Sequence, residues 1–71
     1  HTGGRLDSAL TFYRRTIQLD PQYYQASFQA GLILQRWRAY NQALANYSRV
    51  LQLNPQFPRI HTYIGFCQEQ L

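Results

Sequence analysis

Apolar residues recur at intervals of three and four along most of the chain. Between about residues 5 and 19 they are Leu6, Ala9, Leu10, Tyr13 and Ile17, which fall on one face of a helix. The same periodicity returns over about residues 22–36, 40–53 and 57–70. The pattern therefore predicts four helices, and the short segments between them predict antiparallel hairpins.

Proline separates these helices. The residue before a proline is pushed out of helical geometry, so Asp20-Pro21 and Asn54-Pro55 should end the first and third helices. Asp20 is expected to cap the second helix with its carboxylate, with Pro21 in the first turn. A further proline, Pro58, places the start of the last helix between residues 56 and 58.

The chain repeats itself with a period of 34 residues. A fixed period in this range is typical of stacked repeats, in which neighbouring units complete each other's core. A glycine recurs in the second and fourth helices, where a side chain would hold two helix backbones apart. The equivalent pairs are Ala9 and Ala43, Leu10 and Leu44, Tyr13 and Tyr47, Arg15 and Arg49, Gln18 and Gln52, Pro21 and Pro55, and Gly31 and Gly65.

These residues resemble the tetratricopeptide repeat, a 34-residue helix-turn-helix unit. The chain departs from the family pattern at Ser27 and His61, where a large aromatic residue is common, and at Gln68. The resemblance implies an all-α fold of antiparallel helix-turn-helix repeats stacked as an α-solenoid, with one complete central repeat between two half repeats. The residues of the central unit that match are Ala30, Gly31, Leu34, Ala43, Tyr47 and Pro55.

The repeat domain is expected to cover residues 4–71, with residues 1–3 outside the fold as a disordered or tag-like N-terminus. The last helix resembles the first half of a repeat without its second half. Ile64 and Cys67 are therefore expected to be exposed, either because the chain is cut from a longer array or because it completes itself by self-association.

The resemblance also implies where a partner binds, because the first helices of such repeats line an inner, concave surface. An aromatic and aliphatic floor with amides and two arginines suits an extended or helical peptide with apolar anchors and an acidic group. Alternatively, these side chains pack against an adjoining helix, so that the chain is purely structural or self-associates. The inner positions are Gln25, Phe28, Leu32, Gln35, Arg36, Arg59, Thr62, Phe66 and Glu69, with Tyr23 and Phe57 at the rim.

Composition indicates which classes of partner the chain favours. All seven cationic residues are Arg, and the net charge is +4, which favours an anionic group on the partner. The cations are scattered rather than clustered, so the sequence does not predict nucleic-acid binding. No apolar run approaches the roughly 20 residues needed to cross a bilayer.

The sequence predicts no catalytic, metal or cofactor site. The carboxylates are limited to Asp7, Asp20 and Glu69, and His61 has neither a carboxylate nor a nucleophile three or four residues away. Cys67 stands alone, without zinc-ligand spacing, and is compatible with a reducing compartment such as the cytoplasm. We therefore expect a scaffold rather than an enzyme.

Overall fold

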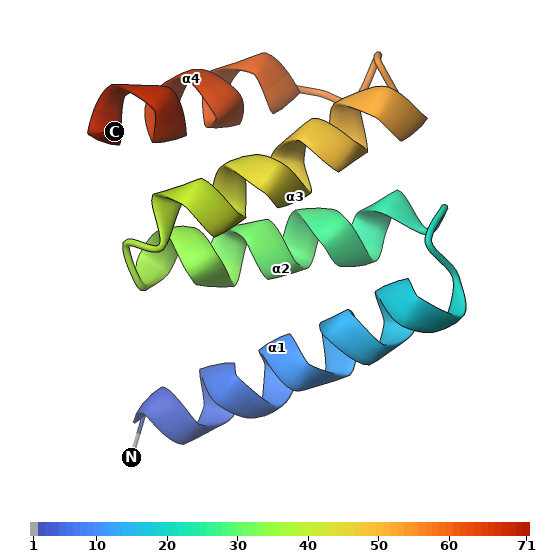
Figure 1. Cartoon of the computed structure of the whole chain (residues 1–71), viewed down its shortest axis with the longest axis vertical. Helices are drawn as coiled ribbons and strands as arrows, with labels where there is room; N and C mark the ends of the chain where they lie inside the picture. The colour runs from blue at the N-terminus through green and yellow to red at the C-terminus, as the bar shows by residue number, and fades with distance from the viewer. Residues whose placement is uncertain (1) are drawn as a thin grey trace.

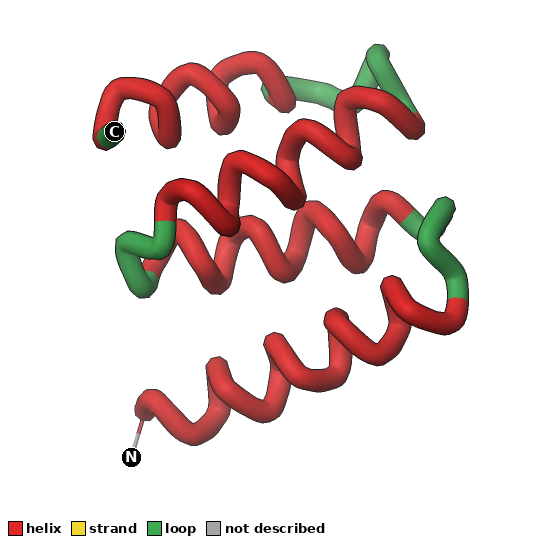
Figure 2. The backbone as a smooth tube through the Cα atoms, viewed as in Figure 1, coloured by secondary structure: helices red, strands yellow, loops and turns green. Residues whose placement is uncertain are grey.

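The computed structural model describes the backbone of residues 2–71 and the side chains of residues 6–71. Four helices, α1 (Thr2–Leu19), α2 (Tyr24–Arg36), α3 (Tyr40–Leu53) and α4 (Ile60–Gln70), follow one another along the chain (Figure 1). Within residues 2–71 the rest of the backbone is loop and turn, with no strand (Figure 2). The predicted all-α fold is confirmed.

Each helix runs antiparallel to the one before it, and the four lie side by side in chain order (Figure 1). α2 packs on both α1 and α3, and α3 packs on both α2 and α4. The extents of 34 × 29 × 17 Å describe a flat stack of helical hairpins. This is the arrangement expected of an α-solenoid.

Two helices begin later than the sequence pattern predicts, and one begins earlier. α1 begins at Thr2, so Thr2 and Gly3, which were expected outside the fold, lie in its first turn. His1 lies outside the described residues. α2 begins at Tyr24 rather than about residue 22, and α4 at Ile60 rather than between residues 56 and 58.

A turn after each Asx-Pro pair delays the helix that follows. The Asp20 carboxylate accepts a hydrogen bond from the Gln22 backbone N–H at 3.3 Å, and Asn54 accepts one from the Gln56 N–H at 3.2 Å. Asp20 therefore closes an Asx turn and does not cap α2, whose N-cap residue Tyr23 makes no side-chain hydrogen bond. The prediction of an aspartate cap was wrong.

The turn between α2 and α3 stops the helix without a glycine. The N–H groups of Arg38 and Ala39 donate to the carbonyls of Gln35 at 3.0 Å and Leu34 at 2.9 Å, the pattern of a Schellman motif. Arg38 occupies the left-handed position of that motif with φ 62°. Arg59, just before α4, has the same φ of 62°.

The core runs through all four helices. Cys67, which the sequence predicted to be exposed, is fully buried, because it lies two turns after buried Ile60 on the face of α4 that packs on α3. Ile64 is half-buried and packs against the same core. The buried cluster consists of Leu10, Ala30, Ile33, Leu34, Ala43, Tyr47, Val50, Ile60 and Cys67.

The two equivalent glycines have different surroundings. A Cβ atom at Gly31 would lie 2.5 Å from Cε1 of Tyr47, so the glycine makes room for an aromatic ring rather than for a second backbone. A Cβ atom at Gly65 would meet nothing within 4 Å. Gly65 lacks the ring that fills the equivalent place in the central repeat.

Candidate functional site

An aromatic cluster links α2, α3 and α4, and we define it as Tyr24, Phe28, Tyr47, Phe57 and Tyr63. The ring centroid of Phe28 lies 4.7 Å from that of Phe57, 5.1 Å from that of Tyr63 and 6.0 Å from that of Tyr47. Tyr47 and Tyr63 are 5.3 Å apart, and Tyr24 and Phe57 5.8 Å. Phe28 is thus the central ring of this cluster.

The Tyr47 hydroxyl donates a hydrogen bond of 2.8 Å to Oε1 of Gln35. Tyr47 is fully buried, and this burial raises the pKa of its phenol far above the ordinary value, with smaller contributions from Cys67 and Tyr63. The ring therefore remains neutral and fixed between α2 and α4.

The structure divides the predicted inner positions into two groups. Phe28 and Phe57 belong to the aromatic cluster, Gln35 binds Tyr47, and Leu32 is half-buried against the core. These four have structural contacts. The remaining positions are exposed, and they are Tyr23, Gln25, Arg36, Arg59, Thr62, Phe66 and Glu69.

One cleft of about 350 Å³, here called the arginine cleft, lies between α1 and α3. Nη2 of Arg14 donates to Gln42 Oε1 at 3.2 Å, and Nη1 of Arg49 donates to the Pro21 carbonyl at 3.4 Å. Both arginines thus bond to neutral acceptors. The lining residues are Arg14, Ile17, Gln18, Ala45, Asn46 and Arg49.

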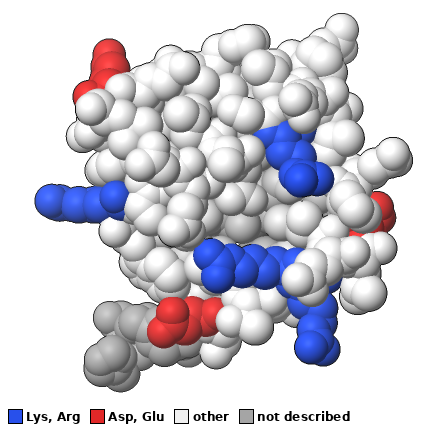
Figure 3. Space-filling view, viewed as in Figure 1, with Lys and Arg blue, Asp and Glu red and all other residues white. Residues whose placement is uncertain are grey.

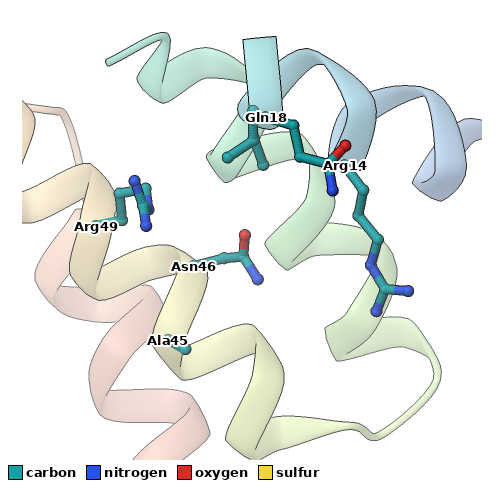
Figure 4. Close-up of a pocket in the computed structure, with 6 residues that line it drawn as sticks. Arg14, Gln18, Ala45, Asn46 and Arg49 are labelled. Carbon is teal, nitrogen blue, oxygen red and sulfur yellow. The ribbon is translucent and has the colours of Figure 1, made fainter. Parts of the chain in front are cut away.

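The arginine cleft is polar and positively charged. Figure 4 shows Gln18 and Asn46 on opposite sides of the gap, with Arg49 beside it. Figure 3 shows basic side chains on both sides of a hollow in this face, whereas the acidic side chains stand at its edges. The sequence gives no signal for this cleft, because periodicity assigns residues to helix faces without showing which faces leave a gap.

A second cleft of about 350 Å³, here called the aromatic cleft, lies between α1 and α2. Phe12 is 65% exposed and Tyr23 45% exposed, although both are large and aromatic. The rings of Phe12 and Tyr13 meet edge to face at 5.5 Å. The lining residues are Phe12, Tyr13, Thr16, Tyr23, Gln25, Ala26 and Gln29, of which only Tyr23 and Gln25 were predicted site residues.

The fold and the repeat are supported by comparison with known families. A family model described as a TPR repeat matches residues 39–71, which span α3 and α4. This match and the four-helix fold support the assignment of the chain to the tetratricopeptide repeat family. No curated protein matched the chain. Tetratricopeptide repeats generally mediate protein–protein interactions, and the family is typically non-catalytic.

The described part of the chain contains neither a membrane-spanning helix nor a cluster of metal ligands. No helix within residues 2–71 combines the length and apolar character needed to cross a membrane. The side chains that the structure describes contain no group of three or more His, Cys, Asp or Glu placed to bind a metal ion.

Proposed function

We propose that this tetratricopeptide repeat protein is a non-catalytic scaffold that binds a peptide segment of a partner protein. The binding site, called here the inner surface, consists of exposed inner positions at the end of α2, just before α4 and on α4. Its residues are Arg36, Arg59, Thr62, Phe66 and Glu69, all of them exposed.

The observation that carries this proposal is the exposure of Phe66. Phe66 is 41% exposed, and its ring centroid lies 6.0 Å from that of Tyr40, so the side chain both packs on a neighbouring ring and remains accessible to solvent. Exposed aromatic side chains held in this way are frequent anchors at protein interfaces. Arg36 and Arg59, one on α2 and one just before α4, add cations suited to an acidic group on the peptide.

The aromatic cluster supports binding indirectly. Phe28 joins rings from α3, α4 and the preceding turn, which fixes α4 relative to α2. A surface that is ordered before binding loses less conformational entropy when a peptide binds.

A structural role is the second candidate, and it is favoured for Phe28, Leu32 and Gln35 by their contacts within the core. Substitution of these residues would change stability and so would not test binding. Phe66 and Arg36 are the informative positions, because they are exposed.

The test is to select peptides from a random library on the immobilised chain and to measure their affinity by fluorescence anisotropy. Phe66→Ala and Arg36→Ala should each weaken binding by about tenfold or more, with unchanged melting temperature. Arg15→Ala, an exposed arginine on α1, is the matched control. Peptides that bind all four proteins equally would contradict the proposal.

A further inference from the structure

We propose that the arginine cleft between α1 and α3 is a second interaction surface, which binds an acidic segment of a partner protein through two carboxylates. The cleft is formed by α1 and α3, whereas the inner surface is formed at α2 and α4. The proposal therefore does not depend on peptide binding at Phe66. It is based on the charge of the cleft and on the two hydrogen bonds that hold its arginines.

The arginine cleft is a gap between two helices that already share a neighbour. α2 packs on both α1 and α3, so the stack of helices is continuous here and the cleft is not the place of a missing helix. Its lining residues recur at spacings of three and four, which places them on one face of each helix. They are Arg14, Ile17 and Gln18 on α1 and Ala45, Asn46 and Arg49 on α3.

Two hydrogen bonds cross between α1 and α3 at different levels of the cleft. Arg14 donates from α1 to Gln42 on α3 at 3.2 Å, and Arg49 donates from α3 to the Pro21 carbonyl just after α1 at 3.4 Å. Gln42 and Arg49 are two turns apart on α3, which is about 10 Å at 1.5 Å per residue. The bonds therefore hold the two guanidinium groups at separate ends of the cleft.

Both guanidinium groups keep their positive charge. Their acceptors are an amide and a backbone carbonyl, which are neutral, and each bond uses one of the five N–H donors of an arginine. Arg14 and Arg49 are also exposed, so the remaining donors are available to a ligand. Figure 4 shows the amides of Gln18 and Asn46 between the two arginines, where they add further donors and acceptors.

The 34-residue repeat does not account for the charge of the cleft. The counterpart of Arg14 one repeat later is Ser48, so the repeat does not require an arginine at this position. Arg14 and Arg49 are far apart in the sequence, and only the packing of α1 beside α3 brings them to one cleft. Scattered cations along the chain thus form a local positive site in the structure.

The geometry favours two carboxylates over one phosphate. A guanidinium group binds a carboxylate through two parallel N–H···O bonds, and groups at separate ends of a cleft match two such anions. Phosphate sites commonly use free backbone N–H groups at a helix N-terminus. The lining residues instead lie beyond the first turns of α1 and α3, where the backbone N–H groups are bonded within the helices.

The middle of the cleft defines the residue between the two carboxylates. Ile17 is half-buried and Ala45 lies on the facing helix, so an aliphatic side chain suits this part of the cleft. Residues of an extended segment are spaced by about 3.3 Å, so acidic residues three positions apart span the two arginines. The side-chain carboxylates of this chain, Asp7, Asp20 and Glu69, include no such pair. The occupant is therefore assigned to a partner protein.

The probe is a capped peptide with two glutamates three positions apart, a leucine between them, and glycine and serine elsewhere. Nitrogen-15 NMR spectra of the protein, titrated with this peptide at about 0.1 M salt, should show saturable shifts of the Gln18 and Asn46 side-chain amides. The same peptide with both glutamates replaced by glutamine should bind at least about tenfold more weakly. This comparison uses the unchanged protein, so it does not depend on a variant folding.

On the protein side, Arg14→Gln and Arg49→Gln should each weaken binding at least about fivefold, with unchanged melting temperature. Arg15→Gln is the matched control, because it removes the same charge from an exposed residue of α1 that does not line the cleft. Arg36→Gln and Phe66→Ala should also leave the affinity unchanged, which separates the arginine cleft from the inner surface.

Four results would overturn the proposal. The absence of saturable shifts would refute binding at the cleft, and equal affinity of the glutamine peptide would refute recognition of carboxylates. Equal weakening by Arg14→Gln and Arg15→Gln would show that only the overall charge matters. Tighter binding of inorganic phosphate or of a DNA duplex, with shifts of the same two amides, would assign the cleft to phosphate groups and refute an acidic protein segment.

Discussion

The two equivalent glycines offer a matched pair of substitutions with opposite expected effects on stability. Gly31 and Gly65 occupy the same position of the repeat, 34 residues apart, and both are inside helices. A methyl group at Gly31 would lie 2.5 Å from Cε1, 2.9 Å from Cδ1 and 3.1 Å from Cζ of Tyr47. A methyl group at Gly65 would meet nothing within 4 Å.

The Tyr47 ring has little freedom to move away from a methyl group at Gly31. It is fully buried, its hydroxyl is bonded to Gln35, and the rings of Phe28 and Tyr63 lie on it. Overpacking of this kind costs about 1–3 kcal/mol. Replacing a helical glycine by alanine also stabilises the helix by about 1 kcal/mol at both positions, because alanine has the higher helix propensity.

Gly65→Ala should therefore stabilise the protein by up to about 1 kcal/mol, since only the helix propensity changes. Gly31→Ala should be less stable than Gly65→Ala by about 1–3 kcal/mol and should fall below the wild type. For a chain of this length, each kcal/mol corresponds to a shift of about 4–8 °C in melting temperature.

Urea denaturation and thermal melting followed by circular dichroism measure both effects. The expected order of melting temperatures is Gly65→Ala, then wild type, then Gly31→Ala. If Gly31→Ala raised the melting temperature as much as Gly65→Ala, the contact between Gly31 and Tyr47 would not exist, and the assignment of the two glycines would be refuted.

Three further substitutions test other contacts. Arg38→Gly should raise the free energy of unfolding by about 1 kcal/mol in urea titrations, because glycine adopts φ 62° without a Cβ penalty; destabilisation would contradict the left-handed turn. Ser27→Ala should stabilise by about 1 kcal/mol in the same assay, because the fully buried Ser27 hydroxyl has no hydrogen-bond partner among the described residues; a loss of stability would reveal a partner. Tyr47→Phe should remove a dependence of stability on pH. Burial raises the folded-state pKa of the Tyr47 phenol above the ordinary 10.0, so the stabilisation from the neutral phenol is complete below pH 10 in the wild type. Above pH 10 the wild-type free energy of unfolding should fall by about 1.4 kcal/mol per pH unit. Parallel pH profiles of wild type and Tyr47→Phe above pH 10 would show that the phenol is not held neutral.

Much of the fold could be predicted from periodicity and the 34-residue repeat. The stack of four antiparallel helices is confirmed, and the family match over residues 39–71 supports the assignment to the tetratricopeptide repeat family. The geometry of the turns was harder to predict. Asp20 could either cap α2 or close an Asx turn with the Gln22 N–H, and the structure has the Asx turn. Cys67 was predicted to be exposed because the last helix lacks the second half of its repeat, but Cys67 lies on the face of α4 that α3 covers.

The candidate site was only partly predictable. The sequence identified inner positions through the family resemblance, but it could not show that Phe28 and Gln35 are used by the core while Phe66 stays exposed. Those outcomes depend on contacts between helices. The aromatic cleft had a signal in the sequence, the equivalence of Tyr13 and Tyr47, but the difference in burial between them requires the structure.

Methyl groups on the inner surface and in the core test the account most directly, because Thr62 is exposed on α4 whereas Ala43 is buried on α3. Methyl NMR spectra of the protein should be recorded during titration with a peptide selected from the library. We expect the Thr62 methyl resonance to shift saturably while the Ala43 resonance stays in place. An unmoved Thr62 resonance, or equal shifts of both, would contradict peptide binding at the inner surface.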